Sequence, residues 1–471
     1  MTNVLLKKIQ LIDDLSVGSD ALLNSLSGVD EKRALGRKSA NILRPFEKNL
    51  TGKILMSTGD YPIWALYLTS LGLSVTLVET NPEKTQLIET LSSQTVGIRR
   101  IGGLSELEKG EAFSTLILSS DITSTEALEE TLEFFTGIDI PQILLPLFSL
   151  TSVDNRRVLN PVSEFVSGWQ IVSVFFSRNA KSGVEEVVNH RATTHKALQD
   201  NLTIQRLNEQ RFTELQASVL LRKNSGEDLN NEDLVCYYSD NRREALCKIT
   251  KICARADGEL YISRAKMFSG EHSHEQFSQV IEDEKFVEGC ALTSRLKSIQ
   301  QTNWGIAEIC DWSAPWIEAL KKHAKTEKKG QFVPQNFVDY VPFNLMLSEG
   351  NLVTPFDLEY VYCQEIPIET VVFRGLYYSL LESEWSNFTG TQWQLSTLVI
   401  DIMTQLDFKL SHEDIKNILS FEDMFQSYVA GPKKRSYGYD MWMKMIENRS
   451  RGIPSFLRKL QLRRAYTAHL T

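Results

Sequence analysis

Strand-like and helix-like segments alternate along residues 53–148, and this rhythm limits the possible folds more than any other feature. The runs differ in period: short apolar runs fit buried strands, and amphipathic runs fit helices. Expected strands are 53–58, 74–79, 114–120 and 142–148, and expected helices are 61–72, 82–93 and 125–137. Such alternation predicts a parallel α/β sheet with helices on both faces. Residues 168–178 and 215–223 are expected to add a closing antiparallel pair.

The remainder of the chain predicts a second, α+β domain. A polar stretch at 223–233 separates it from the first. The expected elements are three strands within 234–268, a helix at 274–286, a linker at 287–292, helices at 293–301 and 314–325, and a hairpin within 335–360. We therefore predict N-terminal helices (1–50), the first α/β domain (51–223), the second domain (224–445) and a C-terminal basic helix (446–471).

Composition excludes several classes of protein. The 471 residues carry 51 basic and 60 acidic side chains, a net charge of −9, which argues against general nucleic-acid binding. Six cysteines without a CxxC pair argue against a zinc site or a disulfide framework. Neither a signal peptide nor an apolar run of membrane-spanning length is evident. The expected location is the cytoplasm.

The order strand, loop, helix, strand, acid within 53–79 resembles the start of class I S-adenosylmethionine (SAM) methyltransferases. In that family the acid after the second strand binds the ribose, and here Glu79 occupies its position. The glycine-rich loop is altered, because Thr58, Asp60 and Pro62 stand where glycines are expected and Gly59 is the one permissive residue. Either SAM binds through Glu79 and Gly59 in a rearranged loop, or the domain is a scaffold that has lost the cofactor.

Three polar residues in 335–360 predict a second site. Asp339 and Asn344 have the D-x₄-N spacing of a kinase catalytic loop, and Asp357 follows after an apolar hairpin. We expect Asp339 to act as the base for an acceptor hydroxyl, and Asn344 and Asp357 to bind Mg²⁺ beside ATP. Together with the order strands, helix, linker, helices and hairpin, this spacing predicts that residues 224–445 form a compact kinase-like domain. The flanking residues differ from the motifs of protein kinases: residues 337–339 are FVD instead of H-R-D, and residues 357–359 are DLE instead of D-F-G.

Further residues are candidates for holding the nucleotide. Lys266 is the expected phosphate cation on the third strand, with Arg264 as the alternative on the same face. Glu275 or Glu282, on the expected helix, would pair with that cation. Glu288, in the linker, is expected to lie beside the adenine.

Segment 335–360 also resembles a bacterial group encoded in surface-polysaccharide gene clusters (O-antigen, capsule and rhamnan-type glycans). The shared form D-x-x-P-x-N…F-D-x-E corresponds here to 339–344 and 356–359. The chain is similar, over about residues 50–430, to methyltransferase–kinase proteins that cap O-antigen chains. The resemblance implies a glycan acceptor, and one form of this hypothesis has the glycan linked to lipid at the inner membrane. It also implies ATP and SAM as cofactors and a glycosyltransferase as a partner.

The last residues, 449–471, hold six basic side chains and no acid. A basic amphipathic helix there would dock on anionic lipid, or pack on the protein's own acidic surface. Three hypotheses follow: a polysaccharide-modifying protein whose kinase-like domain phosphorylates a glycan hydroxyl, a non-catalytic scaffold for a glycosyltransferase complex, and a SAM-dependent glycan methyltransferase.

Overall fold

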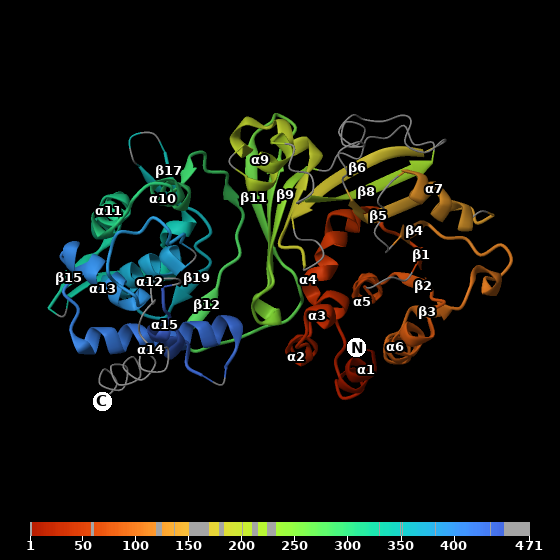
Figure 1. The fold of residues 1–471 in the computed structure, drawn as a ribbon, viewed down its shortest axis with the longest axis horizontal. Coiled ribbons are helices and arrows are strands. Elements are labelled where there is room, and N and C mark those ends of the chain that lie inside the picture. The colour runs from red at the N-terminus through yellow and green to blue at the C-terminus, as the bar shows by residue number, and fades with distance from the viewer. Residues whose placement is uncertain are drawn as a thin grey trace. The chain divides into compact units, whose positions relative to one another are not determined.

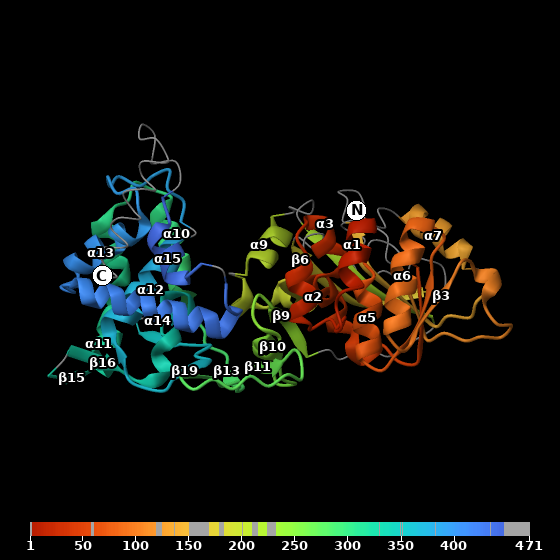
Figure 2. The same cartoon turned by 90° about the horizontal axis from the view of Figure 1, so that it is seen from below.

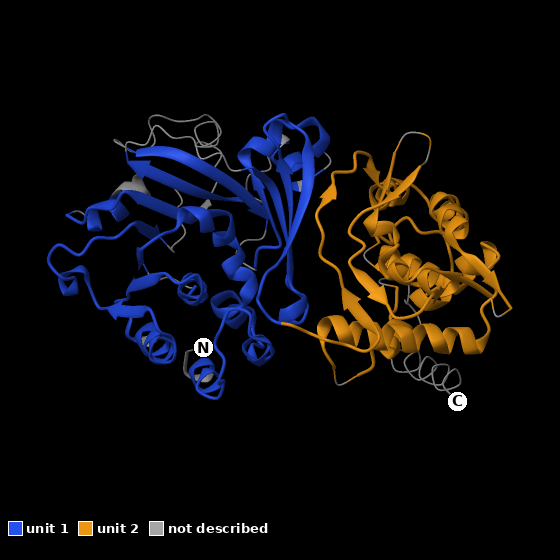
Figure 3. Ribbon diagram, turned by 180° about the vertical axis from the view of Figure 1, so that it is seen from behind, with its two compact units in different colours: residues 1–270 blue, residues 271–471 orange. Residues whose placement is uncertain are grey.

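The computed structural model describes most of the chain, and the statements below concern that part. The described ranges are 2–57, 61–118, 125–135, 137–149, 169–178, 183–199, 201–209, 215–223, 232–328, 330–348, 350, 352–381, 383–433 and 435–446. The chain forms two compact units, residues 1–270 and 271–471, coloured separately in Figure 3. Each unit is described by itself.

Unit 1 begins with short helices and continues with a large mixed sheet (Figure 1). Its helices are α1 (Thr2–Ile9), α2 (Asp20–Ser25), α3 (Val29–Leu35), α4 (Arg37–Ala40), α5 (Ile63–Ser70), α6 (Pro82–Gln94), α7 (Thr125–Phe134) and α9 (Leu202–Asn208). Its strands are β1 (Lys53–Ser57), β2 (Ser74–Val78), β3 (Ile98–Ile101), β4 (Thr115–Leu118), β5 (Gln142–Ser149), β6 (Trp169–Arg178), β7 (Glu186–Asn189), β8 (Leu215–Lys223), β9 (Asp233–Ser239), β10 (Lys248–Ala254) and β11 (Leu260–Lys266).

The strands of unit 1 lie in the order β3-β2-β1-β4-β5-β8-β6-β7-β9-β10-β11. The first five are parallel, and β8 and β6 add an antiparallel pair. The order 3-2-1-4-5 places the reversal of strand order between β1 and β4, as in doubly wound nucleotide-binding sheets. The prediction of a Rossmann-like α/β domain with a closing antiparallel pair is confirmed.

Helices cover both faces of this sheet because its strands are apolar on both sides. Ile54 and Met56 belong to one hydrophobic core, with residues of α1–α6, while Leu55 belongs to a second core with Phe135 and Leu207. Successive side chains of a strand point to opposite faces, so one strand supplies both cores. Helices α5 and α6 contact β3 on the first face (Figure 2).

The sheet extends farther than the sequence pattern predicts. Strand β7, in a stretch that carried no strand signal, pairs with both β6 and β9. Val187 and Val188 are its fully buried residues, and four residues are too few for a clear alternation. Strands β9–β11 therefore continue the sheet of unit 1, whereas we expected them to open the second domain at residue 224. The units divide at residue 270 instead.

Unit 2 is mainly helical, with several small sheets. Its helices are α10 (Leu292–Gln300), α11 (Ile306–His323), α12 (Ile368–Leu381), α13 (Leu395–Gln405), α14 (His412–Ala430) and α15 (Tyr437–Met443). Its strands are β12 (Phe277–Gln279), β13 (Glu284–Lys285), β14 (Cys290–Ala291), β15 (Lys325–Glu327), β16 (Gly330–Val333), β17 (Leu345–Leu347), β18 (Val353–Pro355), β19 (Tyr360–Tyr362) and β20 (Ile366–Pro367). Helix α12 is the centre: residues 370–377 are all buried, and α11, α13 and α14 contact it.

The helix expected at residues 274–286 is wrong. Apolar residues Phe277, Val280 and Ile281 have helical spacing, but β12 pairs with β19 and the Phe277 ring lies 5.3 Å from the ring of Phe425. Packing of this side chain among aromatic rings overrides the local pattern. Glu275 and Glu282, which we had placed on that helix, are exposed residues outside any helix.

Among the described residues, no helix combines the length and the apolar composition needed to cross a bilayer.

Candidate functional site

The hairpin expected in unit 2 is present and brings two of the predicted residues to one end. Strands β17 and β18 are antiparallel, with Leu345 opposite Pro355. The pairing continues one step, because the backbone N–H of Phe356 donates to the carbonyl of Asn344 at 2.9 Å. Asn344 therefore lies directly before β17 and Asp357 lies two residues after β18, at the same end of the hairpin.

Asp339 is connected to Asn344 by a side-chain hydrogen bond. Asp339 ends the 3₁₀ helix η7 (Gln335–Asp339) and is 7% exposed, and Asn344 ends the next one, η8 (Pro342–Asn344). The Asn344 Nδ2 donates to the carbonyl oxygen of Asp339 at 3.1 Å. This bond orients the amide and leaves its Oδ1 as the acceptor that can bind a cation. The three residues predicted from spacing thus lie in one local structure.

The backbone of Asp357 is in the left-handed region, with φ of 60°. Non-glycine residues adopt this conformation at a cost of about 1–2 kcal/mol, and such strain is often found at functional sites. The Glu359 backbone N–H donates to the Asp357 carbonyl at 3.0 Å, and the Asp357 N–H donates to the Glu284 carboxylate at 3.5 Å. Sequence reasoning missed Glu284 because its segment was interpreted as a helix.

The chemistry of the donors fits a hard divalent cation. Mg²⁺ binds oxygen ligands and is usually held by one or two protein groups together with phosphate oxygens and water. The Asp357 carboxylate and the Asn344 amide oxygen match this requirement. Within the described part of the chain, no group of three or more His, Cys, Asp or Glu side chains could hold a metal ion by itself. A cation held by these two groups would complete its coordination with phosphate oxygens or water.

The other predicted nucleotide ligands are placed as follows. Lys266 ends β11 of unit 1, is exposed, and its Nζ donates to the Gly270 carbonyl at 3.3 Å. Arg264 lies on the same strand opposite Thr250 and is half-buried. Glu288 is an exposed residue of unit 2, between β13 and β14. The roles of these residues stay predictions.

A glycine of the linker approaches the hairpin closely. Gly289 has φ of 152°, and a Cβ added to it would lie 2.8 Å from the carbonyl oxygen of Leu347. Its neighbour Cys290 pairs with Leu347 in the sheet. The linker expected to flank an adenine therefore packs directly on the strand that follows Asn344.

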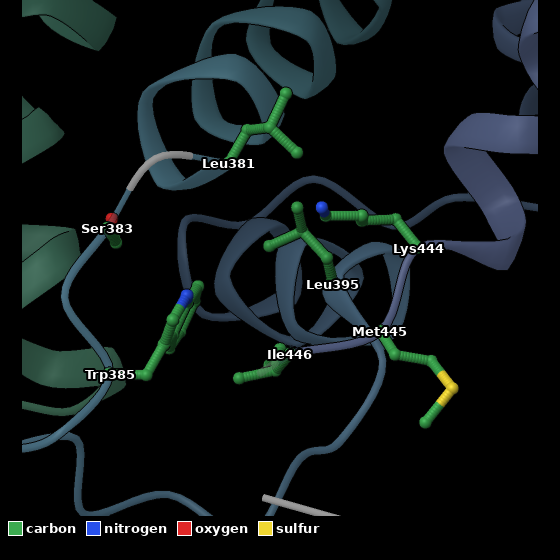
Figure 4. A pocket seen from close by; sticks show the side chains of 7 residues that line it. All are labelled: Leu381, Ser383, Trp385, Leu395, Lys444, Met445 and Ile446. Carbon is green, nitrogen blue, oxygen red and sulfur yellow. The ribbon is translucent and has the colours of Figure 1, made fainter. Parts of the chain in front are cut away.

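A separate pocket of about 220 Å³ lies at the C-terminal end of α12 (Figure 4). Its lining is Leu381, Ser383, Trp385, Leu395, Lys444, Met445 and Ile446. Lys444 contributes an ammonium group and Ser383 a hydroxyl, and the other five lining side chains are apolar. None of its lining residues belongs to the predicted site.

In unit 1, Glu79 directly follows β2, at the carboxyl ends of the parallel strands where ligands bind in such sheets. Glu79 is 5% exposed, and its Oε1 accepts a hydrogen bond from the backbone N–H of Asn81 at 2.7 Å. Gly59, together with Thr58 and Asp60, lies outside the described residues. The buried carboxylate is therefore where the sequence predicts it, and the loop prediction stays a prediction.

The N-terminal helices cover the start of α5. Tyr61 stacks on Trp64 with ring centres 4.6 Å apart, and its hydroxyl accepts a hydrogen bond from Arg33 Nε at 2.9 Å. The Trp64 indole donates to the carbonyl of Ser39 at 2.7 Å. Segment 1–50 is thus an integral part of unit 1.

The chain matches no protein-family model and no curated protein. Solved structures similar to it include a candidate tRNA (m1A22) methyltransferase from Streptococcus pneumoniae with bound S-adenosyl-L-methionine (13% identity, 40% of this chain and 73% of that one, TM-score 0.25). Others are a candidate RNA methyltransferase from Pyrococcus horikoshii (14%, 47% and 97%, 0.26) and the 23S rRNA methyltransferase ErmE (14%, 40% and 69%, 0.25). The fold of unit 1 is assigned from its own strand order.

Proposed function

We propose that unit 2 binds a nucleoside triphosphate together with a divalent cation, and transfers a phosphoryl group to a hydroxyl held by Asp339. The observation that carries the proposal is the hydrogen bond from Asn344 Nδ2 to the Asp339 carbonyl, in a loop whose hairpin ends at Asp357. It links the residue expected to act on the acceptor to the end of the hairpin that offers the cation ligands.

Each residue then has a definite task. Asp339 orients the acceptor hydroxyl and accepts its proton, while Asn344 Oδ1 and the Asp357 carboxylate would hold the cation. A bound Mg²⁺ would neutralise phosphate charge. The acceptor oxygen bonds to the γ-phosphorus, the bond from that phosphorus to the bridging oxygen breaks, and the nucleoside diphosphate leaves with the electron pair. Positioning and electrostatics supply most of the catalysis in such transfers.

The acceptor is proposed from the sequence resemblance in 339–344 and 356–359. We propose a hydroxyl of a bacterial surface glycan, lipid-linked at the inner membrane, which would make the reaction a modification or termination of the polysaccharide. A glycosyltransferase partner and docking of residues 449–471 on anionic lipid belong to the same proposal. These tail residues lie outside the described part of the chain.

Unit 1 supports a second candidate function, SAM-dependent methyl transfer. The observation that favours it is the buried Glu79 carboxylate after β2, beside β1, in a sheet of order 3-2-1-4-5 with an antiparallel closing pair. A carboxylate at that place can accept hydrogen bonds from both ribose hydroxyls of a nucleoside. A third reading is a non-catalytic scaffold, which predicts that neither ATP–Mg²⁺ nor SAM binds.

Calorimetric titration of the full chain separates these readings. ATP with Mg²⁺ and SAM are titrated separately, and each titration is repeated with Asp357→Asn and Glu79→Gln. We expect ATP–Mg²⁺ to bind the wild type and the Glu79 variant but not the Asp357 variant. Absence of ATP–Mg²⁺ binding to the wild type contradicts the main proposal, SAM binding alone supports the second candidate, and binding of neither supports the scaffold.

A further inference from the structure

Three successive carbonyl groups of the loop that carries Asp339 each accept a side-chain hydrogen bond. We call residues 335–344 the Asp339 loop. The carbonyl of Val338 accepts from Arg374 Nη1 at 2.7 Å, and that of Tyr340 accepts from Trp316 Nε1 at 2.9 Å. The carbonyl between them, of Asp339, accepts from Asn344. A loop held at each residue around Asp339 has little freedom to change its backbone.

The donor to Val338 is a buried arginine with an unusual setting. Arg374 lies in the middle of α12 and its side chain is 3% exposed. Its Nε donates to Glu422 Oε2 of α14 at 2.7 Å, and its guanidinium lies 4.4 Å from the centre of the Phe425 ring. Burial opposes the charge of Arg374, but the carboxylates of Glu422 and Asp339 raise the pKa of the guanidinium.

The partner carboxylate is also fully engaged. Glu422 is 1% exposed, and its second oxygen, Oε1, accepts from the hydroxyl of Tyr378 and from Gln426 Nε2, the latter at 2.7 Å. This oxygen is fixed by α12 and α14 themselves. Glu422 therefore fixes the Arg374 side chain, and Arg374 in turn restrains the backbone of the Asp339 loop.

Helix packing by itself does not select an ion pair at such a buried position. Replacing a buried ion pair by apolar side chains of similar volume is often neutral or stabilising. Apolar side chains, however, cannot donate to Val338. Lysine cannot replace the arginine either, because the planar guanidinium directs separate N–H groups at the carboxylate and at the carbonyl. Two fixed acceptors, one bonded to Nε and the other to Nη1, select arginine.

We propose that Arg374, held by Glu422, is a positioning residue that fixes the backbone of Asp339 for its contact with the acceptor. This inference rests on the proposed function for its catalytic consequence. Its structural part, the restraint of the Asp339 loop by α12, does not require a bound nucleotide. The two parts can therefore be tested separately on the full chain.

Close packing beside Arg374 also restrains the Asp339 loop. A Cβ added to Gly375 would lie 2.3 Å from the Trp316 ring and 2.9 Å from Pro342. The next residue of α12 thus lets both the indole that donates to Tyr340 and the loop itself approach the helix. The arrangement joins α11, α12 and the loop at van der Waals distance.

Hydrogen exchange in the ligand-free chain tests the structural part. In Arg374→Lys, the amides of residues 336–341 are expected to exchange at least about tenfold faster, since one of the loop's restraints is lost. Amides of α12 and α14 should keep their protection. The matched control is Tyr377→Phe, which removes a buried hydrogen bond of the same helix, from the Tyr377 hydroxyl to the Met441 carbonyl at 3.2 Å.

Kinetics test the catalytic part. Arg374→Lys should lower kcat by at least about tenfold while KM for ATP–Mg²⁺ changes by less than about threefold, because the nucleotide ligands are untouched. Tyr377→Phe should leave both constants near wild type. If Arg374→Lys does not fold, Glu422→Gln keeps an acceptor for Arg374 Nε and is expected to loosen the loop to a smaller extent.

Unchanged exchange of residues 336–341 in Arg374→Lys, or in Glu422→Gln if that variant is used, contradicts the inference. Equal loosening in Tyr377→Phe also contradicts it, since the effect would then be general destabilisation. Absence of ATP–Mg²⁺ binding by the wild type contradicts the proposed function alone, because the exchange experiment still decides the role of Arg374.

Discussion

The side-chain amide of Asn344 donates to the backbone carbonyl of Asp339 at 3.1 Å. In the proposed function, Asn344 would serve two neighbouring tasks: its nitrogen holds the loop of the expected base, and its oxygen would bind the cation. Spacing in the sequence indicates both residues, but only the structure shows that the amide nitrogen of Asn344 bonds to the loop.

Replacing Asn344 tests that dual role. We expect Asn344→Leu to weaken divalent-cation binding in the presence of ATP by at least about tenfold, and to lower the free energy of unfolding by about 1 kcal/mol. Manganese titration and chemical denaturation measure the two effects. The control is Gln335→Leu, which removes an amide donor to the Cys363 carbonyl (3.1 Å) in the same loop and should not change cation affinity. Equal cation affinity in wild type and Asn344→Leu would exclude Asn344 as a ligand.

The left-handed backbone of Asp357 predicts a conflict between stability and binding. Asp357→Gly should leave the free energy of unfolding unchanged or raise it by up to about 1 kcal/mol, because glycine adopts positive φ without strain. It should also abolish ATP–Mg²⁺ binding. Asp407, with φ of 65°, offers a matched control: Asp407→Gly relieves the same strain and should keep binding intact. Loss of binding in both variants would contradict a specific role for Asp357.

The Glu79 carboxylate predicts the outcome for unit 1. Glu79→Gln keeps an oxygen for the N–H of Asn81, so thermal stability should change little. If SAM binds, its affinity should fall by about tenfold, because the charged acceptor for the ribose is lost. Glu89→Gln, on the exposed face of α6 (Glu89 pairs with Arg100 at 3.4 Å), is the control. Equal SAM affinity in the wild type, Glu79→Gln and Glu89→Gln would show that Glu79 does not bind SAM.

An ion pair among the N-terminal helices predicts the acid stability of unit 1. Hydrogen bonds from the Lys8 ammonium (2.8 Å) and from the Ser27 backbone lower the pKa of Glu31 to about 2. This stabilisation is fully present above the unfolded pKa of about 4.5 and is lost as the pH falls through about 2.

Lys8→Met should therefore reduce the free energy of unfolding by about 1 kcal/mol at pH 7, after allowance for solvent screening, and by progressively less below pH 4.5. Denaturant titrations at several pH values measure the difference. Lys7→Met, an exposed neighbour, should show no such pH dependence. A deficit that stays constant down to pH 2 would show that the lysine acts through packing.

The sequence predicts best where one local pattern decides the structure. The strands around Ile54 and Leu77 and the hairpin after Asn344 follow from short apolar runs bounded by turn residues. It fails where tertiary packing decides. Residues 274–286 have helical spacing yet form no helix, because Phe277 of β12 packs among aromatic rings. Arg374 gave no signal, since a charged residue in a helical stretch is usually at the surface and its partner Glu422 is 48 residues away.

The most direct test of the central claim is electron paramagnetic resonance of Mn²⁺ in place of Mg²⁺, with the full chain and ATP. We predict that addition of the wild-type chain lowers the signal of free Mn²⁺ further than ATP alone lowers it. Asp357→Asn and Asn344→Leu should lack this extra decrease, and Asp407→Gly should retain it. An identical signal with the wild type and with Asp357→Asn would contradict a cation site at the end of this hairpin.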